Sequence, residues 1–248
     1  MVRLFPKTYK TFIILTIFAI AMGFLEAIVV VYLREIYYPQ GFEFPLNTFS
    51  SKMLSVEWIR EISTIIMLVT IGIIAGKNFL QKFSFFLYTF AIWDIFYYVA
   101  LKLILNWPPS LLTWDILFLI PVPWVGPVLA PIMCSLTMIL LGGSIVFLQE
   151  KGYIVKMKAP DWVLLFSGAF IIFCSFIWDY FRIIVQEGLL SSFWKLANNA
   201  HLQEIISQYK PTYYNWWLFT IGEILILLAL ILIFRRSKSI IYNKIANE

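Results

Sequence analysis

The sequence predicts an all-α integral membrane protein: a six-transmembrane-helix bundle with a short re-entrant or interfacial helix before the fourth span. Of the 248 residues, 61% are hydrophobic and only 13% are charged, whereas about a quarter of the residues in a soluble domain are charged. Aromatic residues make up 19% of the chain, which is typical of proteins with aromatic belts at both membrane surfaces. Several apolar segments are also long enough to cross a bilayer, which takes about 20 residues.

The spans follow one another along the chain, so residues 1–248 are expected to form a single transmembrane domain. The first apolar run is too long for the core of a signal peptide, and we interpret it as a retained helix. Glycine and proline punctuate the segments at Gly76, Gly152 and Pro211. The predicted spans cover residues of about 11–33, 56–76, 79–105, 124–148, 161–185 and 213–234.

Two segments between spans have unusual composition. Residues 110–123 are too few to span a membrane and too apolar for an open loop, and prolines crowd their end at Pro121, Pro123 and Pro127. We expect a short re-entrant or interfacial helix there, because irregular backbone at membrane depth must be buried in protein or line a cavity. Residues 189–209 mix apolar and polar side chains at helical spacing, which predicts an amphipathic loop helix or a lid lying on the outer surface.

The distribution of basic residues predicts the orientation. If the N-terminus is inside, the inner segments hold 12 of the 19 lysines and arginines but only three acidic residues. This bias favours a multi-pass protein of the cell membrane with both termini cytoplasmic. The net charge of +5 arises from the basic residues of these inner segments. It therefore gives no reason to expect a nucleic-acid partner.

Charged residues within the predicted spans gather in the outer half of the membrane. Such residues are costly at this depth, so they are expected to face the bundle interior and to pair, bind an ion or stay protonated. Glu57, Arg60 and Glu61 share one helix face by their spacing, as do Asp179 and Arg182. Asp115 joins the group from segment 110–123, and Lys102 lies on a polar stripe with Asp94. The remaining members of the group are Glu26 and Glu223.

The carboxylates in this group outnumber the basic side chains. Arg60, Arg182 and Lys102 cannot neutralise seven acidic residues, so the rest must be protonated, hydrated or bound to a cation. We therefore predict three sets of residues within one acidic, arginine-containing cavity that opens to the outer side. The catalytic candidates are Glu57, Glu61, Asp94 and Asp179; the substrate-binding candidates are Arg60, Arg182, Lys102 and Asp115; and the candidate ligands of Mg²⁺, Mn²⁺ or Ca²⁺ are Glu26, Glu57, Asp94 and Asp179.

No sequence motif selects one function. The single histidine excludes bis-histidine haem ligation within this chain, and the two cysteines form no zinc-finger-type pattern. The first hypothesis is an intramembrane metal-dependent enzyme that acts on a lipid or lipid-linked substrate entering from the membrane. The second is a proton- or cation-coupled transporter, for which a proline-broken helix would be a usual element. The third is a non-catalytic membrane subunit or scaffold. The sequence does not indicate the oligomeric state.

Overall fold

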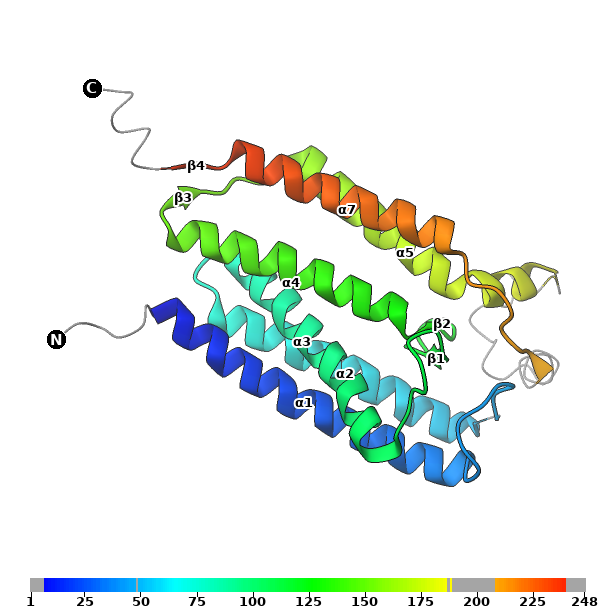
Figure 1. Ribbon diagram of the computed structural model, residues 1–248. Helices are drawn as coiled ribbons and strands as arrows, with labels where there is room; N and C mark the ends of the chain where they lie inside the picture. The colour runs from blue at the N-terminus through cyan, green and yellow to red at the C-terminus, as the bar shows by residue number, and fades with distance from the viewer. Residues whose placement is uncertain (1–6, 48, 187, 189–207, 240–248) are drawn as a thin grey trace, which may run out of the picture.

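The computed structural model describes residues 7–47, 49–186, 188 and 208–239. Six long helices run roughly alongside one another (Figure 1), and all six are long and apolar enough to cross a membrane. The protein is therefore a polytopic helical membrane protein, as the sequence predicts. The helices are α1 (Lys7–Tyr37), α2 (Ser51–Ala75), α3 (Phe79–Leu105), α4 (Leu129–Glu150), α5 (Ala159–Gln186) and α7 (Trp216–Arg236). Of the predicted surface segment 189–209, residues 189–207 lie outside the described part.

Side-chain caps explain why three helices begin where they do. Ser50, Asn78 and Asn215 each accept a hydrogen bond from a backbone N–H in the first turn of the helix that follows. Such caps satisfy donors that have no partner within the helix. Because Ser50 provides this cap, α2 begins at Ser51, five residues before the apolar run from which the span was predicted.

The helices form two groups that meet along α4 and α7. In the first group α3 contacts α1, α2 and α4, and in the second α5 pairs with α7. Close approach of backbones depends on glycine: a Cβ atom at Gly142 of α4 would lie 2.5 Å from the Ser84 carbonyl oxygen of α3. A Cβ at Gly168 of α5 would likewise lie 2.7 Å from the Gly222 carbonyl oxygen of α7. Small residues at helix interfaces allow this kind of packing in membranes.

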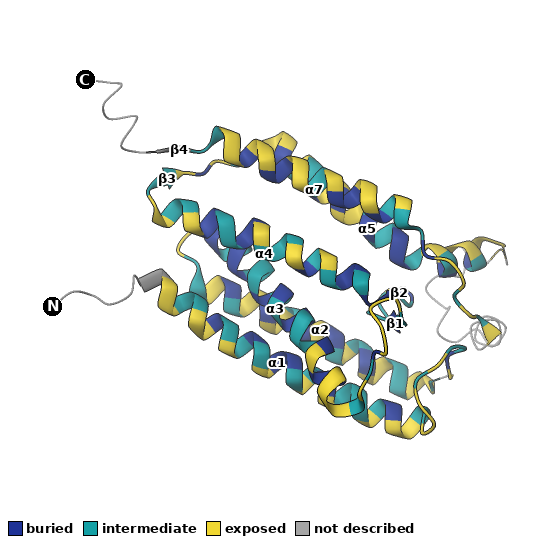
Figure 2. Ribbon diagram, viewed as in Figure 1, coloured by how far each residue is buried: buried dark blue, intermediate teal, exposed yellow. Residues whose placement is uncertain are grey.

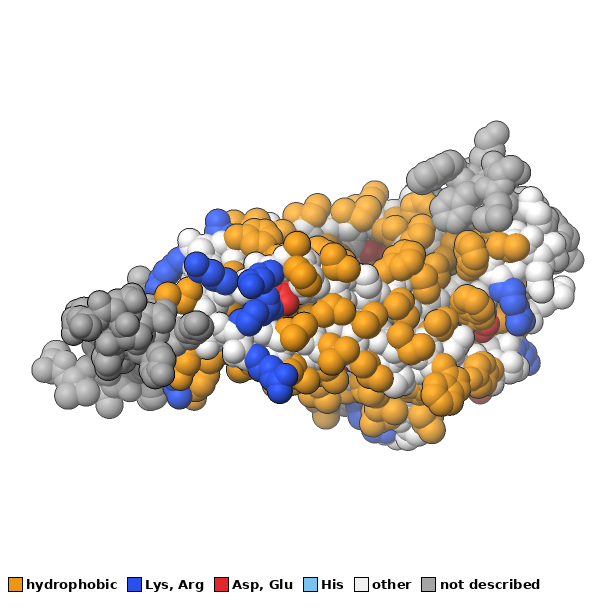
Figure 3. Space-filling model, turned by 90° about the horizontal axis from the view of Figure 1, so that it is seen from above, with side chains coloured by type: hydrophobic (Ala, Val, Ile, Leu, Met, Phe, Trp, Pro, Cys, Tyr) orange, Lys and Arg blue, Asp and Glu red, His pale blue; other side chains and the backbone are white. Residues whose placement is uncertain are grey.

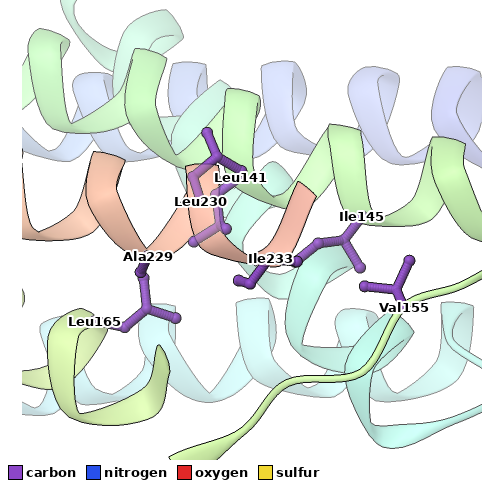
Figure 4. Packing of buried hydrophobic residues seen from close by; sticks show 7 residues of the cluster. All are labelled: Leu141, Ile145, Val155, Leu165, Ala229, Leu230 and Ile233. Carbon is purple, nitrogen blue, oxygen red and sulfur yellow. The ribbon is translucent and has the colours of Figure 1, made fainter. Parts of the chain in front are cut away.

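A hydrophobic cluster joins the two groups at the end of the bundle where α1 begins and α7 ends. Leu141 and Ile145 of α4 meet Leu230 and Ile233 of α7 there (Figure 4). The short strands β3 (Tyr153–Ile154) and β4 (Lys238–Ser239) pair at the same end, and Arg236 forms an ion pair with the buried Asp161 of α5. A second buried cluster joins the same three helices at the hairpin end, where Ala130 of α4 packs with Phe176 of α5 and Phe219 of α7.

The segment predicted as a re-entrant helix is a β-hairpin instead. Strand β1 (Trp114–Ile116) pairs antiparallel with β2 (Val125–Pro127), with Asp115 opposite Gly126. Proline lacks an N–H donor, so the run of prolines at the end of this segment is unsuited to a helix. The hairpin satisfies the remaining backbone groups, for instance through the bonds of Leu117 N–H to Trp124 O and of Trp124 N–H to Phe118 O. It lies at the end of α4 where that helix begins (Figure 1).

Large apolar side chains cover the outward faces of the helices. Exposed residues follow these faces along the whole length of the bundle (Figure 2), and many are isoleucine, leucine and phenylalanine, such as Ile14, Ile66 and Phe170. A soluble protein rarely exposes apolar patches of this extent, so these faces suit contact with lipid. Lysine and arginine side chains gather near the end at which α1 begins (Figure 3).

Candidate functional site

A cavity with a volume of about 460 Å³ lies between the two helix groups. Its walls come from α1, α2, α3, α4, α5, α7 and the hairpin. One part is polar and is lined by carboxylates and arginines of α1, α2 and α3. The other part is an apolar crevice, whose walls are formed by Phe83, Leu87, Leu141, Leu165, Phe166, Ala169 and Phe173. The cavity is therefore amphiphilic, with its charges concentrated in one region.

Arg60 is the centre of the polar region. Its Nε lies 2.8 Å from Glu57 Oε2, its Nη2 lies 3.8 Å from Glu61 Oε1, and its Nη1 pairs with Glu26 across the interface between α1 and α2. Spacing along α2 brings the first two carboxylates to the guanidinium, as the sequence predicted. Glu57 and Glu61 are both buried. One guanidinium thus faces three carboxylates.

Backbone and hydroxyl donors hold two of these carboxylates independently of Arg60. Glu61 accepts hydrogen bonds from the Leu119 N–H at 2.9 and 3.1 Å, which ties the hairpin to α2. Glu26 accepts a hydrogen bond from the Thr64 hydroxyl at 3.1 Å. These contacts fix the positions of the two carboxylates beside Arg60.

Two further carboxylates line the cavity on either side of α4. Asp94 of α3 accepts a hydrogen bond from the Ser135 hydroxyl at 2.8 Å, and Glu223 of α7 accepts one from the Thr137 hydroxyl at 2.7 Å. Both carboxylates are more than 90% buried. Because α4 provides both hydroxyls, it connects the acidic side chains of the two helix groups. Among the described residues, neither carboxylate has a basic side chain within 4.0 Å.

Asp115 and Arg34 close the polar region where the hairpin meets α1. Arg34 Nη2 donates to Asp115 Oδ1 at 3.1 Å, and its guanidinium lies over the rings of Trp107 and Phe42, at 3.8 and 4.5 Å from their centres. Burial raises the pKa of Asp115 to about 6, although Arg34 opposes this shift. The pair fastens the hairpin and the loop after α1 over the cavity.

Three of the predicted site residues lie elsewhere. Asp179 accepts a hydrogen bond from the Tyr209 hydroxyl, and Arg182 is exposed on α5. Lys102 is also exposed, and its ammonium group donates to the carbonyl oxygens of Asn106 and Pro108 just beyond the end of α3. None of the three lines the cavity. The structure therefore brings together Glu26, Glu57, Arg60, Glu61, Asp94, Asp115 and Glu223, but it does not bring Asp179 and Arg182, from the C-terminal end of α5, to this cavity.

The predicted metal-ligand set does not converge. In the described part of the chain, no group of three histidine, cysteine, aspartate or glutamate side chains is arranged to hold a metal ion. Asp179 lies apart from the other candidates, and Arg60 is placed between Glu26 and Glu57. A guanidinium in this position supplies the positive charge that a divalent cation would have supplied.

Sequence reasoning missed three contributors to the site. Arg34 lies just beyond the predicted first span and was not among the candidates, yet it is buried and paired with Asp115. Ser135 and Thr137 are two of the few hydroxyl residues in the apolar fourth span. Their presence there could have indicated polar partners on the neighbouring helices. Two residues apart on a helix, they point to different sides, and a partner on each neighbouring helix could have been expected.

Comparisons with known proteins add no family to this description. No protein-family model matches the chain, and neither the curated proteins nor the solved structures include a significant match.

Proposed function

We propose that this protein binds an amphiphilic molecule from the membrane and acts on it as an intramembrane enzyme. The observation that supports this most strongly is the continuity of the cavity, which joins the Arg60 cluster (Glu26, Glu57, Arg60, Glu61) to an apolar crevice. A polar head group would bind in the charged region, and a hydrocarbon chain would bind between α3 and α5. The substrate class is a lipid or lipid-linked molecule.

The proposed chemistry is acid–base catalysis by buried carboxylates. Asp94 and Glu61 both line the cavity and are nearly inaccessible to solvent. A carboxyl group that faces a bound substrate can act on it as a general acid or base. Arg60, which also lines the cavity, would orient the head group or stabilise negative charge that develops on it. No step of this proposal needs a metal ion.

The second candidate is a proton- or cation-coupled transporter. It is favoured by Asp94 and Glu223, because each is a buried carboxylate held by a single hydroxyl and without a described basic partner. Carboxylates of this kind carry protons or cations in many transporters. The apolar crevice argues against it: no ionisable side chain is found among the residues that line it, so a polar path toward the basic end is missing from the described walls.

Photo-crosslinking of a hydrocarbon chain tests the binding proposal. A hexadecanol carrying a diazirine on its chain should label cavity residues of α3 and α5, such as Phe83 and Phe173. Ala169→Trp would fill the crevice and should abolish this labelling. Ser167→Trp is the matched control, because Ser167 is an exposed residue of the same helix that does not line the cavity. Labelling confined to the outward helix faces, and equal in both variants, would refute the proposal.

A search for products tests the chemistry. Membrane lipid extract incubated with the purified protein should yield a product, detected by mass spectrometry, that the Asp94→Asn variant does not form. The matched control is Glu35→Gln, since Glu35 is an exposed carboxylate at the end of α1. Equal product from the wild type and Asp94→Asn would exclude the proposed role of Asp94.

A further inference from the structure

The walls of the cavity carry an excess of negative charge. Six acidic residues line it, against two arginines. Arg34 forms an ion pair with Asp115 and lies over two aromatic rings, and Arg60 forms ion pairs with three carboxylates. Asp94 and Glu223 then remain without a described cation nearby. A ligand that brought further negative charge into this cavity would be repelled, whereas a positively charged one would be attracted.

One carboxylate oxygen of Glu223 has no hydrogen-bond donor among the described residues. The side chain is 7% exposed, and only its Oε2 accepts a hydrogen bond, from Thr137. Its Oε1 is buried and has no hydrogen-bond partner among the described residues, although the residue lines the cavity. An unsatisfied buried carboxylate oxygen is costly, so a ligand that donates a hydrogen bond there would bind favourably. Asp94 lines the same cavity and adds a second negative charge to its walls.

Aromatic rings line the same cavity as these carboxylates. Trp93, Trp124 and Phe176 line the same cavity, and the indole of Trp124 lies against Phe176, with 6.3 Å between ring centres. A metal ion needs several oxygen atoms at about 2.0–2.6 Å from one point, an arrangement that the described side chains do not offer. An organic ammonium group has less demanding geometry, because carboxylates at hydrogen-bond distance and aromatic faces within about 6 Å both stabilise it.

We propose that the amphiphile bound by this cavity is a long-chain amine: a single hydrocarbon chain with a protonated amino head group. The ammonium group donates a hydrogen bond to the Oε1 of Glu223, Asp94 contributes a second negative charge to the same cavity, and the chain lies in the crevice between α3 and α5. This inference rests on the proposed amphiphile binding and specifies its substrate class. It predicts that binding depends on the charge of the head group and not on the chain alone.

A series of three probes with the same chain tests the inference: dodecylamine, dodecanol and dodecanoate, each added to the protein in nanodiscs of phosphatidylcholine at pH 7. Native mass spectrometry counts the bound probe, and empty nanodiscs correct for partition into lipid. Dodecylamine should bind about tenfold more tightly than either of the other probes, as expected for charge-assisted hydrogen bonds to carboxylates. The comparison needs only the wild-type protein, so it does not depend on any variant folding.

Variants then locate the head group. Glu223→Gln and Asp94→Asn should each reduce the preference for the amine to about threefold or less, while the control Glu35→Gln should retain it. Equal binding of amine and alcohol, with both abolished by Ala169→Trp, would overturn the amine inference and leave amphiphile binding intact. Tighter binding of dodecanoate would also overturn the inference. If none of the probes binds above the level of empty nanodiscs, both the inference and the proposed function fail.

Discussion

Replacing Arg60 by methionine should destabilise the fold more than any other single removal of a basic side chain from the membrane region. The substitution keeps much of the apolar stem but leaves Glu26, Glu57 and Glu61 without their shared guanidinium. Removing one partner of a buried ion pair generally costs about 3–5 kcal/mol, because the remaining charge is buried without compensation.

The structure places the expected loss at the lower end of this range. Glu61 would keep the Leu119 N–H and Glu26 would keep the Thr64 hydroxyl. Only Glu57 would lose every hydrogen bond that it has within the described chain. The Arg60 side chain is also 21% exposed, so solvent weakens its interactions to some extent. We therefore expect a loss of about 3 kcal/mol, of which adding Glu57→Gln to the variant should recover about half.

Unfolding in mixed detergent micelles, followed by tryptophan fluorescence, measures this free energy. Arg182→Met is the matched control, because Arg182 is exposed near the C-terminal end of α5, and its loss of stability should stay within about 0.5 kcal/mol. If Arg60→Met costs no more than Arg182→Met, or if Glu57→Gln makes the Arg60 variant less stable still, then the carboxylates around Arg60 do not depend on it.

Further predictions concern the hairpin, the helix pairs and the topology. Burial raises the pKa of Asp115 to about 6 in the folded protein, so as the pH rises this carboxyl group releases its proton in the unfolded chain before it does so in the folded one. The free energy of unfolding of the wild type should therefore fall by on the order of 3 kcal/mol, relative to that of Asp115→Asn, between about pH 4 and pH 7. A constant difference between the two melting curves would contradict this. Gly222→Leu should prevent the close pairing of α7 with α5 and lower the melting temperature markedly, whereas Gly143→Leu, where nothing lies within 4 Å of the added Cβ, should not; equal melting would refute the packing argument. In a cysteine-free background, a membrane-impermeant maleimide should label intact cells at Ser110→Cys but not at Lys151→Cys, and the reverse pattern would invert the orientation.

The spans were predictable because lipid imposes a simple requirement on sequence. A segment of about 20 apolar residues must be a helix if its backbone groups are to be satisfied in a bilayer. The third span was predicted at 79–105 and forms α3 with these bounds. Other ends shifted by a few residues where caps or loops decide them, as at Ser50 and Asn215. Segment 110–123 was misjudged because apolar length alone does not distinguish a short helix from a hairpin.

The candidate site was predictable where its residues share one helix and was not where they depend on packing between helices. Spacing placed Glu57, Arg60 and Glu61 on one face, and the structure has them together. Asp179 and Arg182 are three residues apart, as Glu57 and Arg60 are. The C-terminal part of α5 that carries them does not reach the Arg60 cluster, because α5 packs on α7. Spacing along one helix reveals a shared face and carries no information about which neighbour that face meets.

A cryo-electron microscopy map of the protein in lipid nanodiscs would show directly whether an amphiphile occupies the cavity between the two helix groups. We expect elongated density that begins beside Arg60, Asp94 and Glu223 and continues past Phe83 of α3 and Phe166 of α5, with no such density in the Ala169→Trp variant. A wild-type crevice without density, or density that is unchanged in the Ala169→Trp variant, would contradict amphiphile binding.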